Sequence, residues 1–225
     1  MIGNEKSASM KLLSINIGKQ QVIITRNQSG PAGIFKQPLS HPVHISSLGL
    51  EGDYIASTRH HGGPDQAVYI YGTTDYAWWE LELGRKISPG TFGENLTISE
   101  LESAHFYIGD RLQMDGVVLE VTAPRIPCGT FAARMGDPEF VKRFRVAERP
   151  GLYCRVIHAG VVEVGDEVSV MPFQGSRVGL IEIYRDYYEK QANVPELRRL
   201  LNAPVAARAR ESLEERLRKA LSTGG

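Results

Sequence analysis

The sequence is poor in the features that identify several common protein classes. It has only two cysteines, Cys128 and Cys154, which are too few for a disulfide framework. No apolar run is long enough to span a bilayer, and residues 1–9 lack the apolar centre of a secretory signal. The 26 basic and 26 acidic residues balance, so bulk charge does not favour a nucleic-acid or anionic-membrane partner. We therefore expect a protein of the reducing cytoplasm that binds neither membranes nor nucleic acids.

Several catalytic signatures are also absent. The sequence has no His-Glu-x-x-His zinc helix, no Cys-x-x-Cys pair, no Gly-x-Ser-x-Gly nucleophile turn and no dinucleotide-binding glycine fingerprint. Zinc held by His60, His61 and Cys128 is disfavoured, because adjacent histidines in a strand point to opposite faces. The sequence therefore matches none of these common catalytic or metal-binding motifs.

Short runs of alternating apolar residues, separated by Gly, Pro and Asp, fill the region from about residue 10 to residue 172. Many short strands with regular turn signals favour a β-barrel or folded-over sheet over a parallel α/β sheet. One hairpin is predicted between 111–114 and 117–122, and a second between 152–157 and 161–164. The body of the protein is thus predicted to be mostly β.

Helical patterns interrupt this body and follow it. Within the body, helices are predicted over 74–83, over 128–135 and after a cap at Asp137. A tail of three short amphipathic helices occupies residues 178–225. Such helices bury little surface alone, so they should dock on the body or on another subunit. The sequence predicts a β-barrel domain at 10–172 and a small three-helix extension at 178–225.

Cys128 lies between two prolines and a predicted helix, in Pro124-Arg125-Ile126-Pro127-Cys128-Gly129. Each proline fixes its own φ and lacks an N–H, so the chain should leave the preceding strand in a stiff turn. Arg125 and the helix N-terminus favour the thiolate, which is the form that a nucleophile or a soft-metal ligand requires. The alternative is a small buried hydrophobe at a turn, a common role of free cysteine.

A glycine-rich segment, His61-Gly62-Gly63-Pro64-Asp65, carries further candidates. The two glycines let the backbone come close to a ligand. His61 is a candidate proton donor near neutral pH, and Asp65 is a candidate to orient its imidazole or to accept from a heterocycle's N–H. A plain glycine turn with solvated imidazoles explains the same residues.

The segment Phe92-Gly93-Glu94-Asn95, with Gly90 and Thr91 before it, is a second glycine-rich loop. Such a loop is able to form an anion-binding nest or to cradle a planar ring with its backbone groups. It is not a P-loop, because it lacks the Gly-Lys-Ser/Thr ending. A purely structural turn is an equal alternative.

Together, these segments resemble the MOSC domain, and most of all its bacterial YiiM-like branch. The matching pieces are Gly-Leu-Glu-Gly-Asp at 49–53, His-Gly-Gly-Pro-Asp at 61–65, Phe-Gly-Glu-Asn-Leu at 92–96, Ile-Gly-Asp at 108–110 and Pro-Arg-Ile-Pro-Cys at 124–128. Each piece is weak by itself, but five in the family's order are specific. The C-terminal helices resemble the three-helix extension often attached to this branch.

The resemblance implies a MOSC-type β-barrel that holds a molybdenum–pterin cofactor (Mo-molybdopterin), with Cys128 as the protein ligand to molybdenum. It implies cofactor contacts from the glycine-rich segments and the turn, namely Gly62, Gly63, Phe92, Gly93, Glu94, Asn95, Arg125 and Gly129. At the family level it also carries pyridoxal phosphate binding and a role in detoxification.

The activity that the resemblance implies is reduction of N-hydroxylated compounds, such as hydroxylaminopurines, amidoximes and hydroxamates. The reaction is a two-electron N–O cleavage, with Cys128, His61 and Asp65 as the catalytic residues and a separate flavin reductase as electron donor. Gln66 departs from the branch, many of whose members have Lys or Arg there, so a cation for phosphate binding or reductase docking is missing. The segment after Cys128 also departs, which leaves substrate scope less defined than the cofactor.

Two other functions fit the same residues. In the first, Cys128 holds a persulfide and the protein delivers sulfur or molybdenum cofactor to another protein. The sequence shows no sulfur-mobilising domain to load such a carrier. In the second, the protein is a pterin-binding scaffold whose helical tail binds a partner or a second copy in a homodimer.

Overall fold

The computed structural model describes residues 10–25, 29–56 and 62–223. At its centre, seven strands form a closed barrel, because β1 pairs with β8 on one side and with β13 on the other. Around the barrel the strands are β13 (Glu167–Met171), β9 (Arg111–Met114), β10 (Val117–Pro124), β11 (Leu152–His158), β7 (Val68–Gly72), β8 (Leu96–Ile98) and β1 (Met10–Gly18). Neighbours are antiparallel except β7 and β8, which are parallel. Closure removes the free sheet edges, and the predicted mostly β barrel is confirmed.

Shorter strands lie outside the seven-stranded barrel. β4 (Lys36–Pro38) extends the sheet beside β1, while β2 (Gln21–Ile24) and β3 (Ser29–Ala32) form a hairpin of their own. A three-stranded sheet contains β12 (Gly160–Val162), β5 (Val43–Ser46) and β6 (Gly49–Leu50).

The hairpin predicted between 152–157 and 161–164 is wrong, because β12 pairs with β5 and not with β11. The pairing places Val162 in the same buried cluster as Val43 and Ile45. Burial of these side chains in the core favours the partner that is distant in the sequence over the adjacent strand.

The structure contains six α-helices within the described ranges. Three interrupt the barrel sequence and three follow it: α1 (Thr73–Leu83), α2 (Gly129–Met135), α3 (Phe140–Ala147), α4 (Leu180–Tyr188), α5 (Val194–Leu201) and α6 (Ala207–Thr223). Short 3₁₀ helices occur at η1 (Pro64–Gln66) and η2 (Ser103–His105). α3 begins later than predicted, since Asp137 accepts a hydrogen bond of 2.9 Å from the N–H of Glu139, which is the N-cap.

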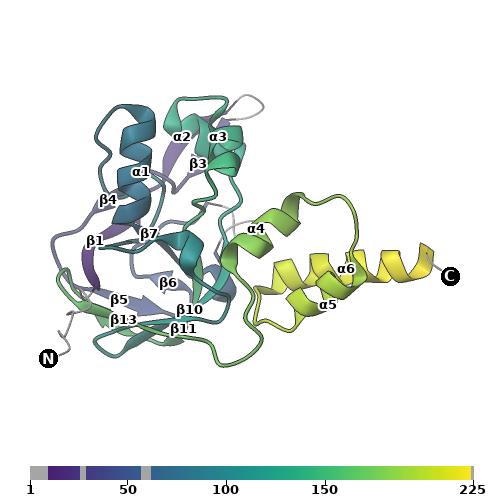
Figure 1. Cartoon of the computed structure of the whole chain (residues 1–225). Coiled ribbons are helices and arrows are strands. Elements are labelled where there is room, and N and C mark those ends of the chain that lie inside the picture. Colours follow the sequence, from purple (N-terminus) through teal and green to yellow (C-terminus); the bar gives the residue numbers. More distant parts are fainter. Residues whose placement is uncertain (1–9, 26–28, 57–61, 224–225) are drawn as a thin grey trace, which may run out of the picture.

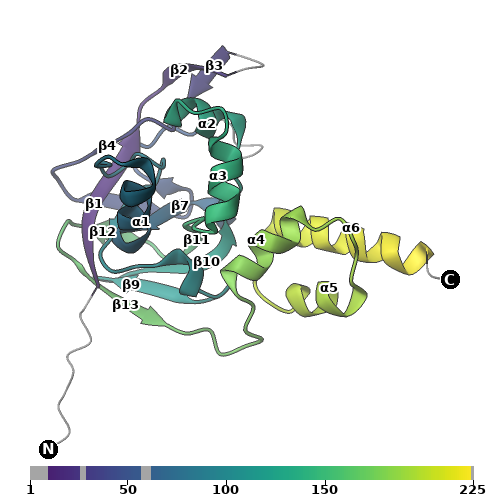
Figure 2. The same ribbon diagram turned by 45° about the horizontal axis from the view of Figure 1, so that its top comes forward.

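The three helices α1, α2 and α3 cover one end of the barrel, whereas α4, α5 and α6 project from its side (Figures 1 and 2). An aromatic core lies beneath the first group. In it, Phe92 stacks on Tyr71 with ring centroids 4.5 Å apart, and Trp79 stacks on Phe144 at 5.9 Å. This second core fixes the position of the loops at that end.

The barrel core continues into the C-terminal helices. Leu180, Leu197 and Leu213 belong to the same buried cluster as Leu119 of β10. Tyr187, next to the last residue of α4, is 61% exposed. Among the described residues, none of the helices is both long and apolar enough to cross a membrane.

Candidate functional site

Cys128 is the N-cap residue of α2, and its thiol is partly exposed. Its backbone is extended (φ −132°, ψ 173°), so it is the last non-helical residue after the two prolines. Cys154, in contrast, is completely buried in β11, and burial raises the pKa of its thiol far above the ordinary value. Of the two cysteines, Cys128 is the one that a ligand can reach, and Cys154 packs in the core.

Arg125 is the charged group beside this thiol. Its side chain is 5% exposed, and its Nη1 donates a hydrogen bond of 2.9 Å to the carbonyl oxygen of Phe92. The guanidinium lies over the rings of Phe131 (4.4 Å) and Tyr69 (5.0 Å). Burial opposes its charge, but Tyr153, Tyr69 and Cys128 outweigh burial and raise its pKa. The buried cation therefore lies on the same turn as Cys128, three residues before it.

One atom of this guanidinium is notable. The Nε of Arg125 is buried and has no hydrogen-bond partner in the described part of the chain. A buried donor without a partner costs about 1–3 kcal/mol. It therefore marks a position where an acceptor group of a ligand would be stabilised.

Gly93 allows the loop to approach Arg125. Its φ is +75°, and an added Cβ would lie 2.9 Å from Cγ1 of Ile34 and 3.4 Å from Nη1 of Arg125. The side chain of Phe92, a predicted cofactor contact, is completely buried in the aromatic core. Phe92 thus acts on the site through its backbone carbonyl and by anchoring the loop.

Glu94 is completely buried and holds the same loop together. Its Oε1 accepts hydrogen bonds from the Gly90 N–H (2.6 Å), from the Thr97 hydroxyl (2.9 Å) and from the Tyr76 hydroxyl. Its Oε2 has no partner among the residues described. Burial raises the pKa of this carboxyl. Because one oxygen of Glu94 accepts three hydrogen bonds, Glu94 stabilises the conformation of the predicted cofactor loop.

Asn95 connects the loop to a buried ion pair that sequence reasoning missed. Its Oδ1 accepts from the Tyr69 N–H at 3.1 Å, and its Nδ2 donates to Asp53 at 2.8 Å. Asp53 also pairs with Lys36 at 2.5 Å, with both side chains under 10% exposed. Burial is the main cause that lowers the pKa of Lys36. Asp53 is the last residue of the 49–53 motif, so the sequence marked it as a candidate. No motif marked Lys36.

Asp65 lies in η1 and makes contacts with three elements. Its Oδ2 accepts from the Ala207 N–H of α6 at 2.6 Å, and its Oδ1 forms an ion pair with Arg155 at 3.2 Å. Its carbonyl oxygen accepts from the Thr122 hydroxyl at 2.5 Å. These contacts make Asp65 a positioning residue at the junction of η1, β11 and α6. His61, the predicted proton donor that Asp65 was expected to orient, lies outside the described residues.

The remaining glycines differ in their surroundings. Gly62 and Gly63 both have positive φ (71° and 82°), which favours glycine at each position. A Cβ on Gly62 would meet Ile55 at 2.9 Å, whereas no atom lies within 4 Å of a Cβ built on Gly63 or on Gly129. Backbone at these last two positions is open to a ligand.

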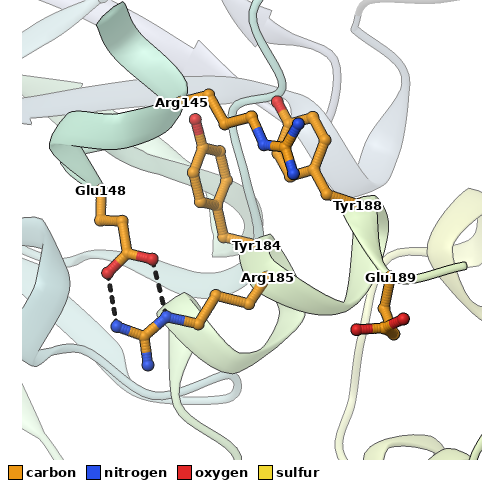
Figure 3. Close-up of a pocket in the computed structure, with 6 residues that line it drawn as sticks. All are labelled: Arg145, Glu148, Tyr184, Arg185, Tyr188 and Glu189. Atoms are coloured by element: carbon orange, nitrogen blue, oxygen red, sulfur yellow. Dashed lines mark hydrogen bonds and ion pairs between the residues drawn. The ribbon is translucent and has the colours of Figure 1, made fainter. Parts of the chain in front are cut away.

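The structure therefore brings Arg125, the Phe92–Asn95 loop and Cys128 together at one end of the barrel. Among the described residues, no three His, Cys, Asp or Glu side chains converge into a metal-binding cluster. A surface pocket between α3 and α4 lies elsewhere, and Figure 3 shows Arg185 paired with Glu148 at its edge. The Nε and Nη2 atoms of Arg185 donate to the Glu148 carboxylate at 2.7 and 2.5 Å. Its lining contains none of the predicted site residues.

A model of the MOSC domain matches residues 57–169. The chain is also 32% identical over 197 residues to the uncharacterized protein YflK of Bacillus subtilis (strain 168), covering 88% of this chain and 89% of that protein. The chain belongs to the MOSC domain family. MOSC domains in general bind molybdenum cofactor.

Two further proteins are similar to this chain. The crystal structure of YiiM from Geobacillus stearothermophilus has a TM-score of 0.76 and 27% sequence identity, and covers 92% of this chain and 99% of that one. A protein of Gibberella moniliformis (strain M3125 / FGSC 7600) named "Reductase" is 30% identical over 196 residues. That alignment covers 85% of this chain but only 35% of the reductase, so most of that protein lies outside the match.

Proposed function

We propose that this protein is a molybdenum cofactor-dependent reductase of N-hydroxylated compounds, such as hydroxylaminopurines, amidoximes and hydroxamates. The observation that carries the proposal is the accessible Cys128 thiol at the start of α2, beside the buried cation of Arg125. Membership of the MOSC family and a relative named "Reductase" support the same chemistry. The activity fits a reducing cytoplasm, where Cys128 stays a free thiol, and a role in detoxification.

The described residues fit a molybdenum–pterin cofactor. A thiolate is a soft ligand and suits a metal that also binds dithiolene sulfur. The unpartnered Nε of Arg125 offers a charged donor to an acceptor atom of the pterin or its phosphate. Open backbone at Gly63 and Gly129 allows a flat ring to approach closely. Cys128 would hold the metal, and Arg125 with the two glycines would hold the organic part.

When bound, this cofactor supplies the two-electron reduction. The overall reaction breaks one N–O bond: a hydroxylamine, two electrons and two protons give an amine and water. Arg125 holds the turn before Cys128 to the carbonyl oxygen of Phe92, and Glu94 and Asn95 keep the loop that carries Phe92 and Gly93 in place. His61 is the proposed source of the proton that leaves with the oxygen.

The electrons come from a separate flavin reductase in this proposal. The Gibberella relative named "Reductase" extends far beyond the part that this chain matches. This arrangement supports a division of labour, in which additional protein supplies what the MOSC part lacks.

The test compares Cys128→Ser with Cys154→Ser, each expressed in a host that makes the cofactor. We expect molybdenum and pterin to copurify with the wild type and with Cys154→Ser, but not with Cys128→Ser. Reduction of benzamidoxime by an artificial electron donor should follow the same pattern. Equal molybdenum in all three proteins would remove Cys128 from the ligand role.

The sulfur-carrier function rests on the same accessible thiol and is separated by a different measurement. A persulfide on Cys128 would appear as cyanide-labile sulfur in protein purified without molybdenum. Such sulfur in the wild type, lost in Cys128→Ser and accompanied by no reductase activity, would favour the carrier over the reductase.

A further inference from the structure

Arg134 is a partly buried cation in the last turn of α2, the helix that begins at Cys128. Its Nε is buried and has no hydrogen-bond partner, and its guanidinium forms no hydrogen bond or ion pair within the described ranges. Burial is the main cause that lowers the pKa of Arg134, and the attraction of Glu94 does not offset it. An acceptor group, above all a negatively charged one, would stabilise this guanidinium.

Phe35, in the segment between β3 and β4, supports this guanidinium. The Cζ of Arg134 lies 5.0 Å from the centroid of the Phe35 ring. The neighbour of Phe35 in the sequence, Ile34, lies against the glycine-rich loop, because a Cβ built on Gly93 would be 2.9 Å from its Cγ1. A ring beneath the guanidinium fixes its plane and leaves the donors at its edge free. Arg134 is thus held beside the loop that we assign to the cofactor.

The same face of α2 also carries the contact with Arg125. Phe131 precedes Arg134 by three residues, so the two side chains share a face of the helix, and the Arg125 guanidinium lies over the Phe131 ring at 4.4 Å. Cys128 and Phe35 both pack on the edge of the same aromatic core. Cys128 lies about 9 Å before Arg134 along the helix axis, and long helical side chains lean toward the N-terminus. A planar molecule bound beside the thiol is therefore within reach of the Arg134 donors.

We propose that Arg134 is a specificity residue of this site, which selects planar N-hydroxylated substrates that carry a carboxylate. The inference rests on the proposed function, because it concerns the substrate of the same reaction. The guanidinium is planar and charged, and two parallel donors match the two oxygens of a carboxylate. Phe35 is a positioning residue, because its ring sets the plane in which those donors point.

This assignment addresses the segment after Cys128, where the chain departs from the YiiM-like branch and the substrate scope was left open. A substrate without the carboxylate leaves the buried Nε of Arg134 unpaired. Sites with an unpaired buried polar group discriminate strongly against the ligand that fails to pair it. The wild type should therefore prefer a charged compound over a neutral one that is otherwise the same.

The experiment uses two compounds that differ only in a carboxylate, 4-carboxybenzamidoxime and benzamidoxime. Their dissociation constants are measured by isothermal titration calorimetry without an electron donor, so that no turnover occurs. We expect the wild type to bind the carboxylate compound about tenfold more tightly, and Arg134→Gln to bind the two compounds within about twofold of each other. Arg134→Lys keeps the charge but loses the planar fork, so it should retain part of the preference.

Arg145→Gln is the matched control. Arg145 also lies over an aromatic ring, with its Cζ 4.1 Å from the centroid of Tyr188. It lines the pocket between α3 and α4, which contains none of the predicted site residues (Figure 3). Loss of this guanidinium should therefore leave the preference for the carboxylate compound as it is in the wild type.

The proposal is overturned if Arg134→Gln and Arg145→Gln show the same preference. It is also overturned if Arg134→Gln alone loses molybdenum after gel filtration, because that result would assign Arg134 to the cofactor instead of the substrate. A preference that depends on Arg134, in a protein that reduces neither compound, would remove the reductase hypothesis and leave the carboxylate-binding role of Arg134 standing. Binding and turnover therefore fail separately.

Discussion

Nη1 of Arg125 donates a hydrogen bond of 2.9 Å to the carbonyl oxygen of Phe92, and this bond joins the turn before Cys128 to the glycine-rich loop. The two residues come from segments that are 33 positions apart. Because the acceptor is a buried carbonyl and the donor a buried cation, the contact has little competition from water. It sets the spacing between the thiol and the loop that we assign to the cofactor.

Gly93→Ala tests this spacing. The alanine would have to keep the left-handed φ of +75°, and its Cβ would crowd both Ile34 and Arg125. We expect a loss of about 1–3 kcal/mol in the free energy of unfolding, together with weaker retention of molybdenum. Urea denaturation measures the first and metal analysis the second. Gly116→Ala is the control, since its φ is +87° and its Cβ would meet no atom within 4 Å. A Gly93→Ala loss no larger than that of Gly116→Ala would show that the contact with Arg125 is not tight.

The buried pair between Lys36 and Asp53 should respond as a unit. Lys36→Met leaves Asp53 without its cation, and Asp53→Asn leaves Lys36 charged among buried groups. Each single change should cost about 3–5 kcal/mol, because it leaves an uncompensated buried charge. The double variant should lose clearly less than the sum, since it removes both charges. Chemical denaturation of the four proteins gives the coupling, and simple additivity would contradict a direct pairing.

Glu94 should make stability depend on pH. Burial raises the pKa of its carboxyl above the ordinary value of 4.5, so the folded protein holds this proton to higher pH than the unfolded chain does. The contribution is fully present below the ordinary pKa and is lost as pH rises through the folded value. The free energy of unfolding of the wild type should therefore fall with rising pH relative to that of Glu94→Gln.

Denaturation curves from about pH 4 to about pH 8 measure this difference for Glu94. Glu214→Gln, at an exposed position of α6, is the matched control and should parallel the wild type throughout. Parallel curves for Glu94→Gln as well would mean that this carboxyl keeps its ordinary pKa in the folded protein.

Asp65→Ala should loosen the C-terminal extension. It removes the acceptor for the Ala207 N–H and the partner of Arg155. We expect faster hydrogen exchange in the first turn of α6 and a loss of about 1–3 kcal/mol. Asp65→Asn keeps an acceptor and should have a smaller effect. Hydrogen–deuterium exchange by mass spectrometry follows both; unchanged exchange in Asp65→Ala would show that other contacts suffice to hold α6.

Local patterns predicted the parts of this protein that neighbouring residues control. Thr73–Leu83 forms the expected helix and ends at Gly84 with a φ of +62°, because glycine accepts the left-handed C-cap. The hairpin predicted between 111–114 and 117–122 is also present, since turn residues restrict their own backbone. Pro124, however, is the last residue of β10 and pairs with Leu152, so the strand runs two residues further than predicted.

The sequence by itself determined the short strands, the helical tail and the place of Cys128 at a strand-to-helix turn, because each depends on residues a few positions apart. Closure of the barrel depends on the pairing of β1 with β13, at opposite ends of the barrel domain. Only the tertiary structure decided that β12 pairs with β5, that Lys36 meets Asp53 and that Asp65 holds α6. These contacts join segments separated by up to 142 positions. No local pattern specifies which distant residue will pair with a buried charge or accept a hydrogen bond from a backbone N–H. That choice follows from packing of the whole chain, in which burial makes every unmet polar group costly.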